Sequence, residues 1–321
     1  MLPSVPAAKI FLDYRLAITR QNWTPVSGGF SGAEVWRGDG PSGPELALKA
    51  WPEDVTPARL ATVHAHIELA AHLPFVPRVV RTATGASLVW DGRRCWDLTR
   101  WVPGAATDAP TVAEVGAAGA AVARLHRAWP VAGSGPCPGV ANRLRALADF
   151  RARLGTPVPA RPPVSEGQIP LVRRAWGLVA ARADGCERAL AEWAAARVRL
   201  SPCVRDLRSE HVLFTRGGVT GLIDFGALAV DHPAVDLARY LGDIAADGGD
   251  RAGAFLAAYR AEAPLDVPDE FVVRLARTGA VCSLVGWLVR LVAERRTFAD
   301  EAAVTRRLLR LVEHVERFAP E

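Results

Sequence analysis

The sequence predicts an α+β protein with two lobes, a small lobe built on a mixed β-sheet and a larger lobe that is mainly α-helical. Its 321 residues are about twice a typical domain length of roughly 150. Short β-like runs continue as far as Trp101, and long runs with helical spacing follow Pro103. We therefore expect an N-lobe of residues 1–102 and a C-lobe of residues 103–321.

The composition excludes several classes of protein. Half of the residues are hydrophobic and 23% are charged, which is typical of a globular chain. The net charge of +5 comes from interspersed acidic and basic residues, so no nucleic-acid partner is expected. The longest uncharged apolar stretch, Thr278 to Val289, is shorter than the roughly 20 residues of a membrane span. Five cysteines without a Cys-x-x-Cys pair indicate free thiols, and we expect a soluble cytoplasmic protein.

Strand-like runs and one helix account for the N-lobe. Segment Pro25 to Val35 contains a Gly-rich turn, and Glu45 to Trp51 alternates as a strand does. The apolar residues between Pro57 and Leu73 recur with helical spacing. Three further strands are predicted, at Arg78 to Arg81, Ser87 to Trp90 and Cys95 to Trp101.

Long helices and one β-rich segment account for the C-lobe. The predicted helices are Thr111 to Trp129, Arg143 to Leu154, Pro170 to Val198, Ala234 to Ala245, Ala252 to Ala261, Pro268 to Arg296 and Glu301 to Phe318. Two Pro/Gly-rich segments, Val131 to Val140 and Thr156 to Pro170, are expected to be loops. Segment Arg199 to Ala227 combines a strand, a polar loop and a hairpin around Gly217.

Lysine is rare in this chain, since Lys9 and Lys49 are the only two among 39 basic residues. Because Arg serves wherever only positive charge matters, Lys49 within a strand indicates a need for a compact ammonium group. Strand alternation puts Ala47 and Lys49 on one face, where the lysine could hold nucleotide phosphates beside a flat base. A lysine that points to solvent at a strand edge is the alternative.

A glycine-rich turn, Ser27-Gly28-Gly29-Phe30-Ser31-Gly32, precedes Lys49. Backbone N–H groups of such a turn can approach phosphate oxygens because no Cβ intervenes. An ordinary hairpin turn explains the same residues.

Two aspartates lie in the β-rich segment. Asp206 opens a polar loop that leads through His211 into a short apolar strand, the arrangement of a phosphoryl-transfer loop. Asp224 follows an apolar strand, where a carboxylate needs a positive partner such as magnesium or Lys49. The alternatives are a salt bridge of Asp206 with Arg205 or Arg208, and turn hydrogen bonds for Asp224.

Together these residues, in this order and spacing, resemble the aminoglycoside phosphotransferase and choline kinase family, which has a two-lobed protein-kinase-like fold. The family's Leu-x-x-Leu-His helix end is matched by Val122 to His126. Its Asp-Pro-x-x-Asp-Leu-Ala segment is matched by His232 to Ala238, with His232 in place of the first Asp. The resemblance implies ATP with Mg2+ or Mn2+, Asp206 as catalytic base, Asp224 and His211 as metal ligands, and Asp231 and Asp236 as supports of the catalytic loop. The nucleotide-binding residues that it implies are Gly28, Gly29, Ser31, Gly32, Ala47, Lys49, Glu68, Trp101 and Leu213.

The chain also departs from the family pattern. Val204 and Arg205 replace a His-Gly pair, and His211 replaces a metal-binding Asn, although imidazole suits softer ions than magnesium. His211 could instead hydrogen-bond within the loop. Glu68, the only Glu on its helix, is the candidate partner of Lys49, and a solvated surface role is its alternative.

We expect an ATP-dependent phosphotransferase that moves the γ-phosphoryl group to a hydroxyl of a small molecule, with a peptide Ser or Thr as a further possibility. The C-terminal helices mix Arg with acidic residues, which weakly disfavours a polycationic aminoglycoside. The competing hypotheses are a nucleotide-binding pseudokinase that acts as a sensor or scaffold, and a helical interaction protein.

Overall fold

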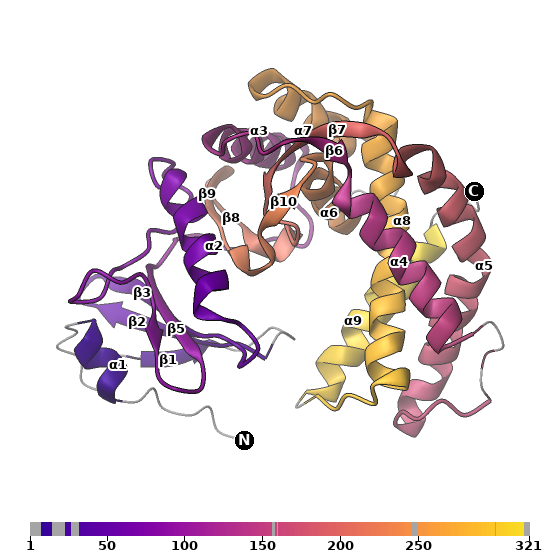
Figure 1. Cartoon of the computed structure of the whole chain (residues 1–321), viewed down its shortest axis with the longest axis horizontal. Helices are drawn as coiled ribbons and strands as arrows, with labels where there is room; N and C mark the ends of the chain where they lie inside the picture. The colour runs from indigo at the N-terminus through magenta and orange to yellow at the C-terminus, as the bar shows by residue number, and fades with distance from the viewer. Residues whose placement is uncertain are drawn as a thin grey trace. The chain divides into compact units, whose positions relative to one another are not determined.

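A computed structural model describes residues 8–14, 23–26, 32–155, 158, 160–244, 249–298 and 300–317. The chain divides into two compact units (Figure 1). The first unit comprises Met1–Asp108, Arg127–Trp129 and Glu210–Leu228, and the second comprises Ala109–His126, Pro130–Ser209 and Ala229–Glu321. The boundary expected at residue 102 would have assigned Glu210–Leu228 to the second part, whereas its contacts place this segment in the first unit.

The first unit is built on a five-stranded antiparallel sheet with strand order β1-β2-β3-β5-β4. These strands are β1 (Trp23–Val26), β2 (Glu34–Gly40), β3 (Gly43–Ala50), β4 (Val89–Trp90) and β5 (Cys95–Arg100). Helices α1 (Ala8–Asp13) and α2 (Pro57–Leu69) belong to the same unit, as does the hairpin of β8 (Val212–Thr215) and β9 (Gly218–Leu222). The predicted strand at Arg78 to Arg81 is reduced to a single bridge, from Val79 to Thr99.

Alternation along β3 sets the two faces of this sheet. Leu48 and Ala50 are fully buried in a core with Trp36, Trp96 and residues of α1. Ala47 and Lys49 therefore lie on the opposite face, as their spacing predicts. The hairpin predicted around Gly217 is present, and its two turn residues, Arg216 and Gly217, both have positive φ, as a two-residue hairpin turn requires.

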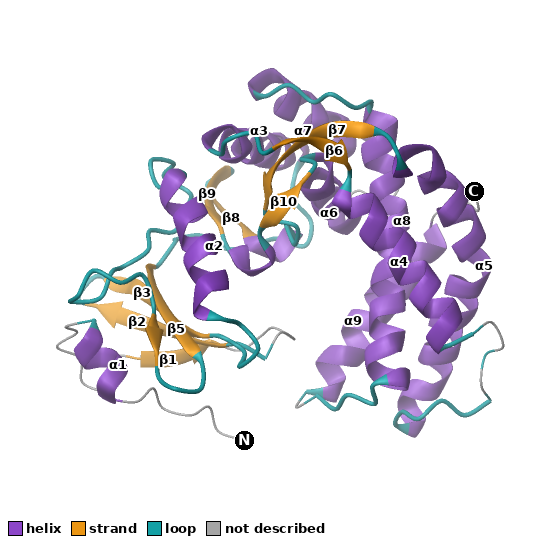
Figure 2. Cartoon of the chain, in the orientation of Figure 1, coloured by secondary structure: helices purple, strands orange, loops and turns teal. Residues whose placement is uncertain are grey.

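The second unit is mainly helical (Figure 2). Its helices are α3 (Val112–Ala128, whose last two residues lie in the first unit), α4 (Pro138–Arg153), α5 (Ile169–Ala194), α6 (Ala234–Ile244), α7 (Gly249–Glu262), α8 (Asp269–Leu288) and α9 (Glu301–Arg317). Every helix predicted here is present, with ends shifted by a few residues. Thr111 and Glu114 form a capping box at the start of α3, since each accepts a backbone N–H bond from the other.

One prediction for this unit was wrong. The Pro/Gly-rich segment at 131–140 contains a strand, β6 (Gly133–Pro136), which pairs with β7 (Arg197–Cys203). β7 also pairs with β10 (Ala229–Asp231), so β6 is an edge strand of a three-stranded sheet. An edge position tolerates Pro136 because one side of the strand needs no ladder hydrogen bond.

Helix α8 forms the centre of the helical unit. Among the described residues, the stretch Asp269–Ala293, which continues α8 through a π-helical turn at Val289–Ala293, is the only one long and apolar enough to span a membrane. Half of its apolar window is buried, and α8 packs against α4, α5, α6 and α9. These contacts are those of a core helix in a helical bundle.

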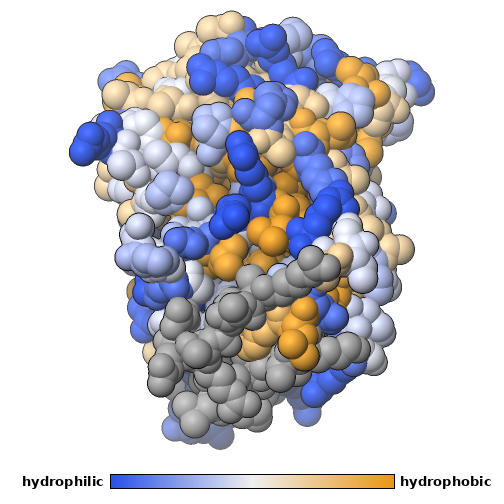
Figure 3. Space-filling view, turned by 90° about the vertical axis from the view of Figure 1, so that its left-hand side faces the viewer, coloured by the Kyte–Doolittle hydropathy of each residue, from blue (hydrophilic) through white to orange (hydrophobic). Residues whose placement is uncertain are grey.

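On the face drawn in Figure 3, hydrophobic and hydrophilic residues both reach the surface. The large apolar residues of the first unit that are exposed, within the described ranges, are Leu12, Val26, Leu69 and Trp90. Exposed apolar residues of this kind are common in folded proteins.

Candidate active site

Lys49 and Asp224 meet in the first unit. Lys49 Nζ donates a hydrogen bond to Asp224 Oδ1 over 3.0 Å and lies 3.9 Å from the ring centre of Trp51, which follows β3. The Lys49 side chain is 19% exposed and the Asp224 side chain 42%, so a ligand can reach the carboxylate. The prediction that Asp224 needs magnesium or Lys49 beside it is confirmed for Lys49.

The backbone of Asp224 is bent into the left-handed region, with φ of 60° and ψ of 67°. Asp tolerates this region better than most residues because its short side chain can bond locally. Burial alone would raise the pKa of the Asp224 carboxyl, but Lys49, His211 and the Gly226 N–H outweigh it and hold the pKa below its ordinary value. Asp224 therefore stays ionised at neutral pH.

The turn after Asp224 is fixed by contacts with α2. Arg59 Nη2 donates to the carbonyl oxygens of Gly226, at 3.0 Å, and of Leu228, at 2.5 Å. A Cβ at Gly226 would lie 2.9 Å from the ring of Trp51, so only glycine fits there. These contacts hold Trp51, and with it Lys49, against the Asp224 turn.

His211 begins the hairpin that leads to Asp224. Its Nε2 lies 3.8 Å from Asp224 Oδ2 and 3.8 Å from Glu210 Oε1, and its side chain is largely buried. The Ile223 N–H donates to the His211 carbonyl oxygen over 3.0 Å, which ties the two predicted metal ligands together through the backbone. The oxygen of Asp224 suits a hard cation such as Mg2+, whereas the imidazole of His211 is a better ligand for softer ions.

Glu68 does not pair with Lys49 among the ion pairs of the described residues. It lies at the end of α2 and pairs with Arg81 over 2.5 Å at the surface. One turn earlier on α2, His64 points inward and its Nε2 lies 2.8 Å from Asp97 Oδ2, with both side chains buried. Asp97 is the β5 residue directly opposite Lys49.

The remaining predicted nucleotide residues are distributed over the first unit. Gly32 has φ of +80°, the left-handed conformation that favours glycine, whereas Gly28, Gly29 and Ser31 lie outside the described residues. Ala47 lies on β3 between Arg37 and Thr99 of the neighbouring strands. The Trp101 N–H donates to the Glu45 carbonyl oxygen, and Leu213 lies on β8.

Asp206 belongs to the second unit, where Arg239 contacts it. Arg239 Nε lies 3.0 Å from Asp206 Oδ1, and 41% of the Asp206 side chain remains exposed. Arg239 follows Asp236 by three residues, which puts both on one face of α6. The sequence interpretation did not identify Arg239, although this spacing was a usable signal.

Asp236 supports the loop that carries Asp206. The backbone N–H groups of Val204 and Arg205 donate to its two carboxylate oxygens over 2.7 and 2.6 Å. His126 Nε2 lies 2.9 Å from Asp236 Oδ2, and His126 Nδ1 lies 2.9 Å from the Tyr259 hydroxyl. The fully buried carboxylate is thus surrounded by donors, so its charge is compensated.

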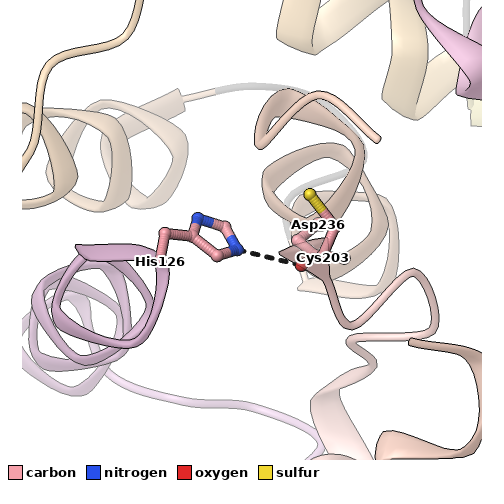
Figure 4. A group of neighbouring side chains, drawn as sticks. All are labelled: His126, Cys203 and Asp236. Carbon is pink, nitrogen blue, oxygen red and sulfur yellow. Dashed lines mark hydrogen bonds and ion pairs between the residues drawn. The ribbon is translucent and has the colours of Figure 1, made fainter. Parts of the chain in front are cut away.

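His126, Asp236 and Cys203 lie close enough together to be considered as a metal site (Figure 4). Figure 4 shows His126 pointing toward Asp236, along the hydrogen bond described above. Burial raises the pKa of the Cys203 thiol, so the sulfur stays protonated and is a poor metal ligand. We interpret this group as support for the loop.

Arg205 occupies a position where the family that this sequence resembles has glycine. Its backbone φ is +65°. This conformation is strained for a residue with a Cβ. Arg205 Nε lies 3.2 Å from Asp231 Oδ2, while Asp231 Oδ1 accepts from the N–H groups of Gly139 and His232. The ion pair supplies a positive partner for the fully buried carboxylate of Asp231.

His232, where the family has its first Asp, caps α6. Its Nδ1 accepts the Ala234 N–H over 3.1 Å, and its Nε2 lies 2.7 Å from Asp266 Oδ1. Burial lowers the pKa of His232, and the acceptor role of Nδ1 requires a proton on Nε2. A neutral histidine therefore does the capping that an aspartate would do.

Comparison with known proteins identifies the family. A family model described as "phosphotransferase enzyme family" matches residues 22–275. The chain is 30% identical over 271 residues to a homoserine kinase of Acidiphilium cryptum (strain JF-5), which covers 82% of this chain and 78% of that relative.

Solved structures identify the fold. A complex of amicoumacin kinase hAmiN with AMP-PNP, Ca2+ and Ami has a TM-score of 0.65 at 16% identity, over 97% of this chain and 92% of that one. An aminoglycoside phosphotransferase from Alicyclobacillus acidocaldarius has a TM-score of 0.59 at 19% identity, over 99% and 98%. The expected kinase-like fold is confirmed, and the chain belongs to the phosphotransferase enzyme family.

Proposed function

We propose that the protein is an ATP-dependent kinase that transfers the γ-phosphoryl group to a hydroxyl of a small molecule. The observation that carries this proposal is the 3.0 Å contact of Lys49 Nζ with Asp224 Oδ1, made by one of only two lysines in the chain. An ammonium and an ionised, accessible carboxylate in one place suit a nucleotide and its metal ion. We place the protein in the cytoplasm, with no nucleic-acid or membrane partner.

In this proposal Lys49 steadies the α- and β-phosphates and Asp224 holds Mg2+ or Mn2+. The metal ion, when bound, would neutralise charge on the phosphate oxygens. His211 is the proposed further ligand, and its imidazole favours Mn2+ over Mg2+. Gly28, Gly29, Ser31 and Gly32 are proposed to cover the phosphates, and Ala47, Trp101 and Leu213 to contact the base.

Asp206 orients the acceptor hydroxyl and takes its proton. Arg239 Nε donates a hydrogen bond to Oδ1 of the carboxylate, which helps to fix its orientation toward the acceptor hydroxyl. Asp236 fixes the backbone directly before Asp206 through the N–H groups of Val204 and Arg205, so the carboxylate is positioned before the substrate arrives. Positioning and charge stabilisation are the main sources of rate in phosphoryl transfer.

Thermal melting with ATP and Mg2+ or Mn2+ tests the nucleotide site. We expect the melting temperature to rise in the wild type and to stay unchanged in Lys49→Ala and Asp224→Ala, because bound ligand stabilises only the native state. Glu53→Ala is the matched control, since Glu53 pairs with Arg93 at the surface. The absence of any shift with every metal would contradict the proposal.

ADP formation with hydroxyl acceptors tests the chemistry. Hydroxylated amino acids, including homoserine, are the first group to test because of the relative in Acidiphilium cryptum. Asp206→Asn should keep the nucleotide-dependent melting shift and lower kcat by about 10²- to 10⁴-fold. Equal turnover in Asp206→Asn would exclude Asp206 as the base.

A nucleotide-binding pseudokinase is the second candidate, favoured by His211 at the metal-binding Asn position. It predicts the same melting shift without ADP formation. His211→Asn should then create activity, whereas an active enzyme should already turn over with His211 in place.

A further inference from the structure

Arg143 on α4 is a half-buried cation without a carboxylate partner among the described residues. Its Nη1 donates to the Gly139 carbonyl oxygen over 2.9 Å, one turn earlier on the same helix. Nε is buried and has no hydrogen-bond partner in the part of the chain that the structure describes. A guanidinium in this environment is costly unless an anion compensates its charge. Among the described residues, the Arg143 guanidinium therefore donates only the one side-chain hydrogen bond, from Nη1.

Two glycines make room for the guanidinium. A Cβ at Gly279 of α8 would lie 3.2 Å from Arg143 Nη2. A Cβ at Gly139 would lie 3.2 Å from Nη1, although Val235 Cγ2, at 2.4 Å, would restrict it more. Glycine in the interior of a helix is destabilising relative to alanine, so Gly279 within α8 carries a stability cost. The guanidinium therefore lies against the backbones of two packed helices, α4 and α8.

Arg143 lies beside the support of the Asp206 loop. A Cβ at Gly139 would lie 3.2 Å from both Arg143 Nη1 and Asp231 Oδ1, and Asp231 Oδ2 pairs with Arg205, the residue before Asp206, over 3.2 Å. Burial lowers the pKa of Arg143, and the positive charge of Arg239 acts in the same direction. Arg239 in turn contacts Asp206 over 3.0 Å, within the same unit. An anion bound at Arg143 would thus lie beside the loop that carries Asp206.

Asp231 is the alternative partner, since its Oδ1 and Arg143 Nη1 would each lie 3.2 Å from a Cβ at Gly139. Its carboxylate is already used, however, because Oδ1 accepts from the N–H groups of Gly139 and His232 and Oδ2 pairs with Arg205. No ion pair within 4.0 Å joins Arg143 to Asp231 or to another described carboxylate. The charge of Arg143 is therefore available for a ligand.

We propose that Arg143 binds an anionic group, a carboxylate or a phosphate, of the hydroxyl acceptor. This inference rests on the proposed function, because it assigns the chemical class of the acceptor that Asp206 would activate. Arginine suits this role because its planar guanidinium presents several donors to one carboxylate or phosphate. The acceptor is then a hydroxylated acid and not a polycation.

Binding of inorganic phosphate tests Arg143 without any turnover. The measurement is the phosphate-dependent rise in melting temperature in a Lys49→Ala background, which removes the proposed nucleotide-phosphate contact. We expect the rise to be lost on adding Arg143→Met and kept on adding Arg151→Met, a control on the same helix whose arginine pairs with Glu187 and Asp184 at the surface. An equal rise with and without Arg143→Met would overturn the proposal.

A matched series of acceptors tests the chemical class. The compounds are 3-hydroxypropionate, propane-1,3-diol and 3-aminopropan-1-ol, with the four-carbon homologues of each. We expect ADP formation with the acids, and a rise in KM of roughly 10- to 100-fold in Arg143→Met with KM for ATP unchanged. Preference of the wild type for the diols or amines would overturn the proposal.

The two experiments separate failure of this inference from failure of the proposed function. If no acceptor is phosphorylated but phosphate binding still depends on Arg143, the proposed anion site is supported and the proposed kinase reaction is contradicted. If Arg143→Met does not fold, Arg143→Lys replaces it, because lysine keeps the charge and loses the planar set of donors. Arg143→Lys should then weaken phosphate binding at least threefold, and unchanged affinity would overturn the proposal.

Discussion

Lys49 and Asp224 lie 175 residues apart in the sequence, and Lys49 Nζ donates a hydrogen bond to Asp224 Oδ1 over 3.0 Å. The ammonium also lies over the ring of Trp51, which leaves no room for a Cβ at Gly226, two residues after Asp224. Both charged groups are thus held in place before any ligand binds. A nucleotide with its metal ion would meet a preorganised site.

The contribution of the Lys49–Asp224 pair to the stability of the free protein should be small. Because the Asp224 side chain is 42% exposed, solvent screens the attraction. We expect a coupling of less than about 1 kcal/mol in a double-mutant cycle of Lys49→Ala and Asp224→Ala, measured by urea unfolding. The same variants should abolish nucleotide binding. A coupling well above that value would mean that the pair serves mainly the fold.

Arg239 should act through Asp206. We expect Arg239→Gln to lower kcat by about 10-fold or more and to leave KM for ATP unchanged, because the Asp206 carboxylate loses the donor at Oδ1. Arg239→Lys should recover part of the rate, since it restores a cation without the guanidinium geometry. Steady-state kinetics of both variants decides this. A purely structural role would lower the melting temperature of both without changing kcat.

The strained backbone of Arg205 can be measured by a pair of substitutions. Arg205→Ala and Arg205→Gly both remove the ion pair with Asp231, but only glycine relieves φ of +65°. We expect Arg205→Gly to be more stable than Arg205→Ala by about 1 kcal/mol in urea unfolding. Equal stability of the two variants would show that the left-handed conformation costs nothing here.

Acid should destabilise the protein through His314 on α9. Burial and the nearby Arg317, Arg239 and Arg307 lower its pKa to about 4, although Asp243 opposes them. The folded state therefore binds the proton less readily than the unfolded state, so stability is full above pH 6.5 and falls as the pH drops toward 4. His314→Gln should reduce the loss of unfolding free energy between pH 7 and 5 by about 1–2 kcal/mol. An identical pH dependence in both proteins would contradict this.

Periodicity predicted most of the fold. The helices from α3 to α9 and the strands β3 and β5 follow from the spacing of apolar residues, since one face of each is buried. The strand β6 was missed because Gly and Pro usually mark turns, and only its edge position, a tertiary property, permits them. The local sequence pattern could not predict β6, because this strand forms through its pairing with β7.

The sequence identified some of the residues that the structure brings together in the candidate site, and it missed others. Lys49 and Asp224 were identified because each residue type is unusual in its surroundings, and the structure brings them together. Glu68 was chosen as the only acid on its helix, but its place at the end of α2 directs it to Arg81. The contact of Arg239 with Asp206 was missed because it joins a loop to a helix 33 residues later, a relation that depends on tertiary packing.

The hydrogen bonds of Asp236 also bear on how this protein folds. They tie His126 to α6 across 110 residues and the Asp206 loop to α6 across 32. Contacts between distant residues form late, because a long loop must close before they stabilise anything. The conformation of the Asp206 loop is therefore a product of nearly complete folding. A nascent or partly unfolded chain should therefore lack the proposed kinase activity. During refolding, this activity should return at the rate of the slowest folding step.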